Sequence, residues 1–258
     1  MYRKCNVIYN NDLGNDYVRL CFDLGTHTVQ FQPGQFVMLK AWQGNDPFLM
    51  RPFSINSFNA DNNTVEIVYH CVGKGTELMR SLKAQDGIEI LGPLGQGFTL
   101  KESYKSIALI GRGVGAAPLR FLAEQALRQG ITPYIFLSAR SSEMLFDRNI
   151  YDAMGIDVYT SINPQELVTD KLRDLIEIVK IDAAYTCGSK RLMQELQQIC
   201  KQYAIEGYVS LEEHMACGVG ACLGCVCNIA AEPGLNKEVR VCKEGPVFDI
   251  ERVVANQN

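Results

Sequence analysis

Residues 106–127 read SIALIGRGVGAAPLRFLAEQAL, and this stretch decides the fold class of the chain. Residues 107–110 form an apolar run typical of a buried strand, and the glycine-rich loop GRGVG follows it directly. Apolar side chains then recur at helical spacing at Leu119, Leu122, Ala123, Ala126 and Leu127. The stretch therefore predicts a strand, a tight loop and a helix in immediate succession.

The same alternation continues downstream. Residues 134–137, 157–160 and 183–186 are strand candidates, and the segments 172–179 and 192–203 repeat their apolar residues with helical spacing. Strands that alternate with helices imply a parallel sheet with helices on its faces. We expect this central nucleotide-binding domain to span residues 101–208.

The first hundred residues follow a different pattern. Val18, Leu20 and Phe22 alternate with polar neighbours, which is the period of a half-buried strand. Residues 35–42, 65–69 and 87–91 are further strand candidates, and turn residues separate them. Many short strands at this spacing predict a small antiparallel barrel over residues 1–100. With a small C-terminal unit at residues 209–258, the predicted fold class is β + α/β.

A cysteine-rich run near the C-terminus, ACGVGACLGCVCNIAAEPGLNKEVRVC at 216–242, carries the most specific chemistry. Its spacing is C-x4-C-x2-C with a fourth cysteine after 16 more residues, which is typical of a plant-type [2Fe–2S] ligand loop. The ligands would be Cys217, Cys222, Cys225 and Cys242, because soft thiolates hold iron where carboxylates would not. Cys227 offers an alternative pair with Cys225, although the x2 spacing favours Cys225 as the ligand.

Two other kinds of cysteine site compete with the cluster. A structural zinc site usually pairs C-x2-C with a second such pair or with histidines, whereas here the first gap is four residues and holds Gly218 and Gly220. A disulfide framework is typical of small secreted chains. This chain has 258 residues and opens MYRKCNVIYNND without an apolar leader, so we expect reduced cysteines and a cytoplasmic location.

Charge and hydropathy exclude some classes of partner. The formal net charge is −4 and no basic stripe is present, which argues against a nucleic-acid partner. No apolar run approaches the length that spans a bilayer, so we expect no membrane association.

Two short motifs in the barrel suggest phosphate binding. They are Arg51-Pro52-Phe53-Ser54 and the turn at residues 73–76, GKGT. An arginine on a rigid strand and glycine-rich backbone can both grip a diphosphate, but each motif alone is weak. Together with GRGVGAAP at 111–118 and the Cys-Gly pair at 187–188, they resemble the ferredoxin–NADP reductase superfamily. The C-terminal ACGVGACLGC and VCKEGPVF runs narrow the resemblance to the electron-transfer subunits of class 1B dihydroorotate dehydrogenases, over essentially the whole chain.

The resemblance implies a set of cofactor contacts. Residues that would line the isoalloxazine or diphosphate of FAD are Arg51, Pro52, Phe53, Ser54, Val68, Tyr69, His70, Gly75 and Thr76. Gly111 and Gly113 would belong to the loop for NAD, and the four cysteines would hold the cluster. In the family this subunit passes electrons from an FMN-containing catalytic subunit to NAD, in a cytoplasmic heterotetramer of pyrimidine synthesis.

The chemistry is consistent with that assignment. A nicotinamide moves a hydride, which carries two electrons, while an iron–sulfur cluster takes one, so a flavin must stand between them. The chain has room for these three sites and little else. We therefore expect the substrate-oxidising site on a partner protein.

Two departures from the family fall in the NAD half. Arg112 stands where glycine is usual; its guanidinium could pair with phosphates, its bulk could fill their place, or it could point into solvent. After Thr160 the family usually continues with an acidic residue and a glycine-rich stretch, whereas residues 161–166 here read SINPQE, without any glycine. We expect dinucleotide binding to be weakened or altered here, with flavin and cluster retained.

Two alternative functions stay open at this point. The first is a related iron–sulfur flavoprotein serving another dehydrogenase, or ferredoxin. The second is a non-redox module that binds zinc in the cysteine loop. Minor candidates are His214 and Trp42, for which we expect packing or surface roles, and Cys187, which could reach the nicotinamide side of the flavin.

Overall fold

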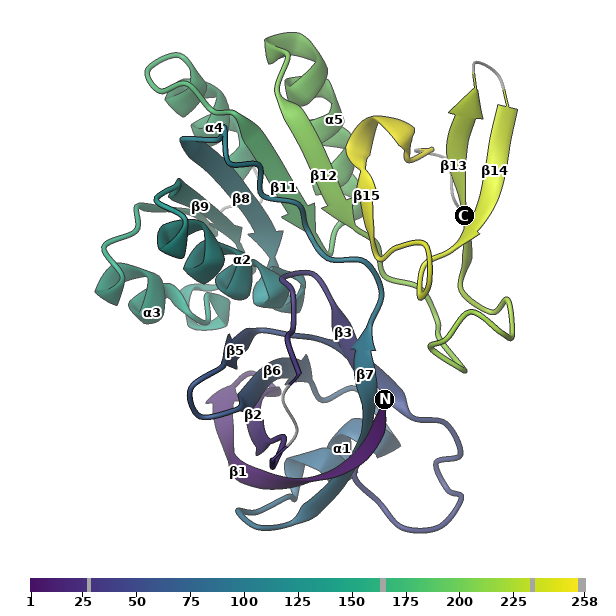
Figure 1. Cartoon of the computed structure of the whole chain (residues 1–258). Coiled ribbons are helices and arrows are strands. Elements are labelled where there is room, and N and C mark those ends of the chain that lie inside the picture. Colours follow the sequence, from purple (N-terminus) through teal and green to yellow (C-terminus); the bar gives the residue numbers. More distant parts are fainter. Residues whose placement is uncertain (27–28, 163–165, 233–234, 255–258) are drawn as a thin grey trace.

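The computed structural model describes residues 1–26, 29–162, 166–232 and 235–254. Figure 1 shows an N-terminal sheet that curls into a barrel, a central sheet between helices, and a C-terminal hairpin beside the central sheet. These parts match the predicted fold class. The chain begins at the barrel, and near its last described residues Val253 pairs with Ile229.

The barrel is a seven-stranded sheet with the order β4-β3-β7-β1-β2-β6-β5. All its pairings are antiparallel. Its strands are β1 (Tyr2–Gly14), β2 (Tyr17–Asp23), β3 (Phe36–Lys40), β4 (Arg51–Ser54), β5 (Ser57–Asn59), β6 (Thr64–His70) and β7 (Gly87–Leu94). A helix, α1 (Lys74–Arg80), follows β6. The sequence pattern did not reveal β5 or α1, because a three-residue strand and a seven-residue helix are too short for a clear hydrophobic period. It also did not reveal the 13-residue β1, whose buried positions Arg3, Cys5 and Val7 include a charged residue.

The central sheet has six strands in the order β10-β9-β8-β11-β12-β15. They are β8 (Ser106–Arg112), β9 (Thr132–Ser138), β10 (Val158–Ser161), β11 (Ala183–Cys187), β12 (Glu206–Ser210) and β15 (Val247–Asp249). The first five run parallel, as the alternation of strands and helices predicted, whereas β15 pairs antiparallel with β12. The predicted boundary at 208 falls inside β12, and the C-terminal unit supplies β15, so the division into three domains stays a proposal.

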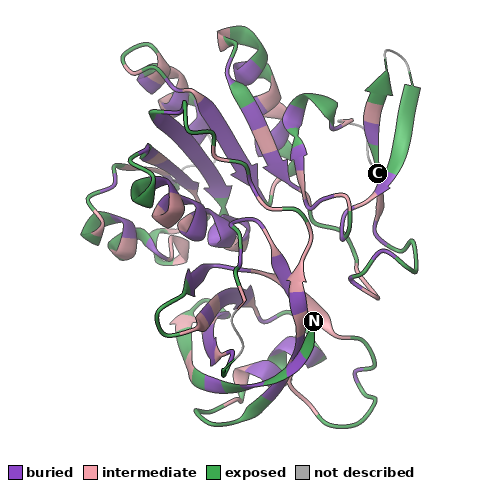
Figure 2. Cartoon of the chain, viewed as in Figure 1, coloured by how far each residue is buried: buried purple, intermediate pink, exposed green. Residues whose placement is uncertain are grey.

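Helices cover both faces of the central sheet. They are α2 (Ala117–Arg128), α3 (Arg148–Ala153), α4 (Val168–Ile176) and α5 (Lys190–Tyr203), with short 3-10 turns η1 (Gly113–Ala116), η2 (Ser142–Met144) and η3 (Ile250–Arg252). Successive side chains of β8 point to opposite faces: Ile107 and Leu109 pack with α2, while Ala108 and Ile110 pack with α4 and α5. Figure 2 shows the resulting burial of the central strands.

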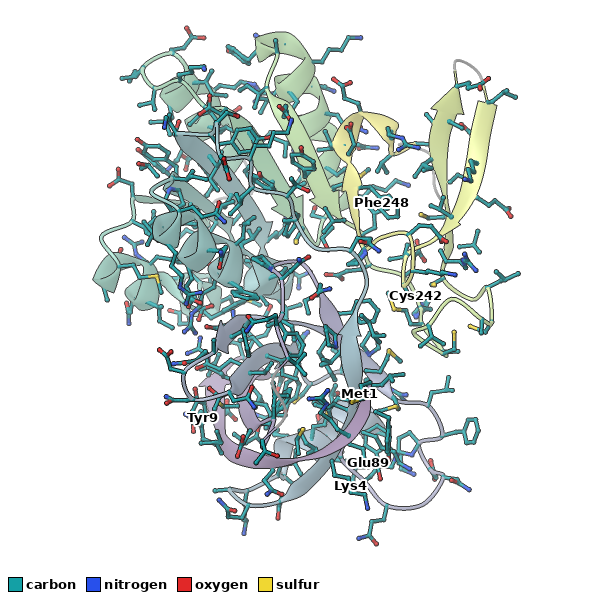
Figure 3. All side chains as sticks on the ribbon, viewed as in Figure 1. Met1, Lys4, Tyr9, Glu89, Cys242 and Phe248 are labelled. Atoms are coloured by element: carbon teal, nitrogen blue, oxygen red, sulfur yellow. The ribbon has the colours of Figure 1, made fainter. Side chains whose placement is uncertain are left out.

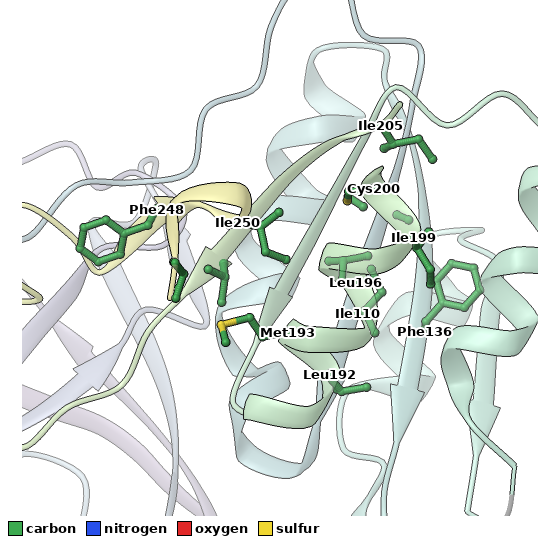
Figure 4. Close-up of a cluster of buried hydrophobic side chains, with 14 of the residues drawn as sticks. Ile110, Phe136, Leu192, Met193, Leu196, Ile199, Cys200, Ile205, Phe248 and Ile250 are labelled. Carbon is green, nitrogen blue, oxygen red and sulfur yellow. The ribbon is translucent and has the colours of Figure 1, made fainter. Parts of the chain in front are cut away.

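The C-terminal unit combines a hairpin with the cysteine loop. The hairpin is β13 (Val226–Glu232) and β14 (Leu235–Arg240), paired antiparallel. Its inner side chains, such as Cys227 and Ile229, join a core cluster that runs through Phe248 and Ile250 to helix α5. Figure 4 shows this junction: Ile250 and Met193 lie near each other beside α5, while the Phe248 ring points away from that helix. The hairpin is thereby anchored to the central domain.

A buried polar joint connects the barrel to the central domain. Asn56 is fully buried, and its Nδ2 donates to Ala117 O at 2.8 Å and to Asp147 Oδ2 at 2.9 Å. Arg120 of α2 donates from Nη1 to Glu66 Oε2 at 2.8 Å, and Arg19 pairs with Asp147. These contacts tie β2, β5 and β6 to the helices α2 and α3.

No helix within the described part of the chain is both long and apolar enough to cross a membrane.

Candidate functional site

The first cavity, of about 480 Å³, opens where all three parts of the molecule meet. Every residue that the resemblance assigns to the flavin lines it: Arg51, Pro52, Phe53, Ser54, Val68, Tyr69, His70, Gly75 and Thr76. The central domain adds Val114, Ala117 and Pro118, and the segment before the cysteine loop adds residues 211–213 and Met215. We call this the flavin cavity.

Aromatic side chains stiffen the barrel wall of the flavin cavity. The rings of Phe53 and Tyr69 lie 5.6 Å apart between centroids, and those of His70 and Tyr17 lie 4.9 Å apart. Because β4 and β6 carry these residues on a sheet, their positions are fixed by the ladder as well as by packing. Such a wall suits a planar ring system.

Arg51 is the cation at the edge of the flavin cavity whose charge is free for a ligand. Its guanidinium donates to the Leu49 carbonyl at 2.5 Å and lies 5.8 Å from the Trp42 ring centroid. Within the described residues it has no carboxylate partner, whereas Lys74, which also lines the cavity, is paired with Asp46. Trp42, which the sequence suggested was barrel packing, also supports Arg51, and its indole donates to Pro47 O at 2.6 Å.

The turn before α1 is held by Thr76. Its hydroxyl accepts from the backbone N–H groups of Val72 (3.0 Å) and Gly73 (3.2 Å), and donates to Gly73 O (2.9 Å). Thr76 thus shapes the turn rather than offering a free hydroxyl. The sequence motif located this turn but not the helix that begins within it.

The flavin cavity also includes residues that the barrel motifs did not reveal. They come from other parts of the chain: Phe36, Val114, Ala117, Pro118, Leu211, Glu212, Glu213, Met215 and Pro246. Gly111 and Gly113, in contrast, line neither this cavity nor the second one described below. The loop they belong to is nevertheless held tightly, because a Cβ on Gly115 would lie 2.4 Å from Cα of Gly188.

The cysteine loop packs directly on the barrel. Gly218 has φ +69°, and a Cβ at this position would lie 2.6 Å from Cγ of Met38 in β3. Only glycine combines that backbone conformation with so close an approach. Figure 3 shows Cys242 in this region, near the barrel and below the hairpin. The loop is therefore held beside the flavin cavity.

Backbone groups of the loop point at cysteine sulfur. Burial raises the pKa of Cys217, but N–H groups of Val219, Cys222 and Ala221 and the Cys222 thiol outweigh it and lower that pKa to about 6. Cys242 donates its backbone N–H to Sγ of Cys225 at 3.4 Å. N–H donors directed at sulfur stabilise thiolates and are what an anionic iron–sulfur cluster needs. The residues present therefore fit such a group.

The thiols fall into two neighbouring pairs. Cys222 lies beside Cys217, and Cys225 lies beside Cys242, whose pKa burial and that neighbour raise to about 12. Across the described ranges, no three His, Cys, Asp or Glu side chains form a group that could hold a single metal ion. The four predicted ligands thus lie as two pairs, and their role as cluster ligands stays a prediction.

Three minor candidates are also located. Cys227 lies in the hydrophobic core, where burial raises the pKa of its thiol to about 11, so it is a packing residue beside the ligand pattern. Cys187 is buried, and burial raises its pKa; it does not line the flavin cavity. The side chain of His214 is exposed, as expected for a residue with a surface role.

A second cavity, of about 330 Å³, lies at the carboxyl ends of β8, β9 and β10. Arg112, Arg140 and Arg191 line it, together with Ser138, Ser161, Thr169 and Ser189. Arg112 is exposed at the end of β8, so it faces both solvent and this cavity. Of the divergent run after Thr160, residues 163–165 lie outside the described residues.

Comparison with known proteins gives matches over most of the chain. Residues 4–98 match the oxidoreductase FAD-binding domain family, and residues 212–254 match the iron-sulfur cluster binding domain of dihydroorotate dehydrogenase B. A protein of Caldanaerobacter subterraneus subsp. tengcongensis, named dihydroorotate dehydrogenase B (NAD(+)), electron transfer subunit, is 36% identical over 97% of this chain and 98% of its own length. A Bacillus mycoides protein of the same name is 32% identical over 98% of this chain and its full length.

Solved structures share the fold at lower identity. An NADH-dependent reduced ferredoxin-NADP oxidoreductase structure aligns with a TM-score of 0.85 at 22% identity, covering 98% of this chain and 90% of its own. Phthalate dioxygenase reductase aligns with a TM-score of 0.68 at 13% identity, covering 94% and 77%. At these identities the likeness concerns the arrangement of barrel, central sheet and C-terminal unit.

Proposed function

The chain belongs to the electron transfer subunits of dihydroorotate dehydrogenase B, and from that membership we propose that it relays electrons between a partner dehydrogenase subunit and a nicotinamide dinucleotide. It is an oxidoreductase subunit that binds FAD and an iron–sulfur centre. The relatives carry NAD(+) in their name. The family match at both ends of the chain supports this function over a zinc module.

One observation carries the relay. Met215 lines the flavin cavity and stands two residues before Cys217, so the cavity and the cysteine loop adjoin each other. When bound, FAD exchanges electron pairs with a nicotinamide as hydride and passes them singly to an iron–sulfur cluster. The chain's part is positional: β4 and β6 would hold the ring system, and Arg51 would neutralise the diphosphate.

The cysteine loop would hold a [2Fe–2S] cluster through Cys217, Cys222, Cys225 and Cys242. Gly218 keeps the loop against Met38 of the barrel. Val114 and Ala117 would close the cavity from the central domain. Gly111 and Gly113 would shape the dinucleotide loop without touching the flavin.

The partner would be an FMN-containing catalytic subunit that oxidises dihydroorotate to orotate, in a cytoplasmic heterotetramer of two subunit types. The relatives' designation as an electron transfer subunit supports a partner chain. The dihydroorotate site would then lie on that partner subunit.

The decisive experiment is a cofactor inventory followed by reconstitution with the partner. Purified protein should contain FAD, two irons and two acid-labile sulfides per chain, counts that follow from a [2Fe–2S] centre held by four cysteines. Mixed with an FMN-containing dihydroorotate dehydrogenase subunit, it should make dinucleotide reduction dependent on dihydroorotate. Zinc in place of iron, or a complex that forms without coupling, would refute the proposal.

A second redox function is kept because of Arg112 and the run after Thr160. A related reductase subunit serving another dehydrogenase, or ferredoxin, would use the same flavin and cluster. It would be recognised by coupling to ferredoxin without the dihydroorotate-oxidising subunit. In either case we predict poor bleaching of the flavin by NADH, and rapid stoichiometric reduction at low NADH would contradict this.

A further inference from the structure

The second cavity concentrates positive charge that the protein does not neutralise. Within the described residues, Arg112, Arg140 and Arg191 all line it, and no ion pair engages any of these guanidinium groups. Its two acidic lining residues are each paired with another cation: Glu166 with Lys171 at 3.1 Å, and Glu195 with Arg173 at 3.3 Å. The cavity therefore attracts a ligand with more than one negative charge.

Helix ends add further positive potential. Helices α4 and α5 both begin at this cavity, so their positive dipole ends lie at it, and at α5 the Leu192 N–H donates to the Ser189 hydroxyl. Thr169, in the first turn of α4, is fully buried, and its Oγ1 has no hydrogen-bond partner. The buried Oγ of Ser138, at the end of β9, is also unpartnered. Both oxygens are enclosed by protein atoms and have almost no surface open to the cavity, so the arginines are the groups that a ligand there would meet.

The type of side chain at the carboxyl end of the second strand of the sheet distinguishes sites for NAD from sites for NADP. In nucleotide-binding sheets, an acidic residue there binds the ribose 2′-hydroxyl of NAD, while a nearby arginine accommodates the 2′-phosphate of NADP. Here β9 ends at Ser138 and is followed by Arg140, and β10 ends at Ser161. No carboxylate free of a cation partner lines the cavity among the described residues.

We propose that the second cavity binds a 2′-phosphorylated dinucleotide, NADP(H), more tightly than NAD(H), with Arg140 and Arg191 on its phosphates. This rests on the proposed function and specifies its dinucleotide. It also accounts for one departure in the NAD half. Arg112 adds positive charge where the family usually has glycine, and Glu166, the acid of the run after Thr160, is neutralised by Lys171 at 3.1 Å.

The test compares two nucleotides that differ in the position of phosphate. The FAD- and cluster-loaded protein is titrated calorimetrically with adenosine 2′,5′-bisphosphate and, separately, with ADP. The first should bind at least about tenfold more tightly, which is about 1.4 kcal/mol. In stopped-flow mixing, NADPH should bleach the flavin at lower concentration than NADH.

Matched variants locate the effect. Arg140→Gln and Arg191→Gln should each weaken binding of the bisphosphate by about tenfold or more while changing ADP binding less, because one charge-assisted contact contributes about 1.5–3 kcal/mol. Arg128→Gln, an exposed arginine at the end of α2 outside this cavity, is the control and should change neither. Circular dichroism and retained flavin confirm that each variant folds.

Equal or weaker binding of the bisphosphate, or unchanged binding in both arginine variants, would overturn the inference. The result is independent of the partner subunit, since the titration needs neither dihydroorotate nor coupled turnover. If the protein prefers ADP but still couples to dihydroorotate oxidation, the proposed function stands and the inferred preference for NADP(H) is refuted. If the protein prefers the bisphosphate but does not couple to dihydroorotate oxidation, the selectivity of the cavity stands and the dihydroorotate-oxidising partner is refuted.

Discussion

The two cavities differ in how they are built. The flavin cavity draws on the barrel, the loop after β8 and the segment before Cys217, and Arg51 is its one arginine. The second cavity is made by the central domain alone, from strand ends and helix starts, and is lined by Arg112, Arg140 and Arg191. A site assembled from distant segments depends on how those segments dock, whereas a site at the edge of one sheet depends on its local side chains. Mutations should separate the two.

Gly218→Val should have the largest effect and should act on the flavin side. The added side chain meets Met38 at a backbone φ of +69°, so strain and overpacking together should cost about 4 kcal/mol. Iron content and melting temperature should fall, while binding of adenosine 2′,5′-bisphosphate in the folded fraction should persist. Gly87→Ala, where an added Cβ meets nothing within 4 Å, is the control. Normal iron content in the Gly218 variant would show that the loop does not need this docking.

Arg120→Met should weaken the joint between the two cavities. The guanidinium bridges Glu66 at 2.8 Å and Glu124 at 3.0 Å with little exposure. Its removal leaves Glu66 with Tyr9 and Arg19 and Glu124 with Ser57, and the two lost charge-assisted contacts should together cost about 3 kcal/mol. Denaturant unfolding measures the loss. The double variant with Glu66→Gln should recover part of it. Additive losses in the double variant would mean that the pair is not coupled.

Arg51→Gln should affect the flavin cavity alone. Losing a charge-assisted contact to a diphosphate is expected to reduce FAD affinity by about 30-fold, the equivalent of about 2 kcal/mol. Fluorescence titration of the flavin-free protein gives the affinity. Nucleotide binding in the second cavity should not change. Wild-type FAD affinity in this variant would show that Arg51 does not contact the diphosphate of FAD.

Trp42→Leu should have the smallest effect. The indole stacks near Arg51 with 5.8 Å between guanidinium carbon and ring centroid, an interaction worth about 0.5–1 kcal/mol, so FAD affinity should fall about threefold. Trp42→Phe keeps an aromatic face and should recover most of the affinity. If leucine and phenylalanine behave alike, Trp42 acts by packing rather than by orienting Arg51.

Sequence patterns predicted an element best where its hydrophobic period repeats over a long segment. Strands β8, β9, β10 and β11 and helices α2, α4 and α5 were confirmed because their apolar residues repeat over several turns or a full strand. The parallel strand β12 and the six-residue helix α3 were missed. Helix α1 was missed because its first residues read as a turn motif, and β15 was missed because three residues carry no period. The strand β15 also owes its place to pairing with β12, which no local pattern encodes.

The candidate site divides in the same way. Residues 51–54 and the cysteine spacing are visible in the sequence because phosphate and iron impose fixed residue types at fixed intervals. No sequence motif could reveal Leu211, Glu212 and Met215, because they reach the flavin cavity only through the docking of the C-terminal unit. The loop of Gly111 and Gly113 was visible, but its neighbour Arg112 needed the structure to show which cavity it faces.

By itself, the sequence determined the order of the parts, the type of each sheet and the thiols that would bind iron, since these follow from nearest neighbours and from side-chain chemistry. Tertiary structure alone decided that the cysteine loop adjoins the flavin cavity and that three arginines share the second cavity. The reason is that contacts between distant segments depend on packing of whole elements, such as Gly218 against Met38, and local sequence carries no record of which surfaces will meet.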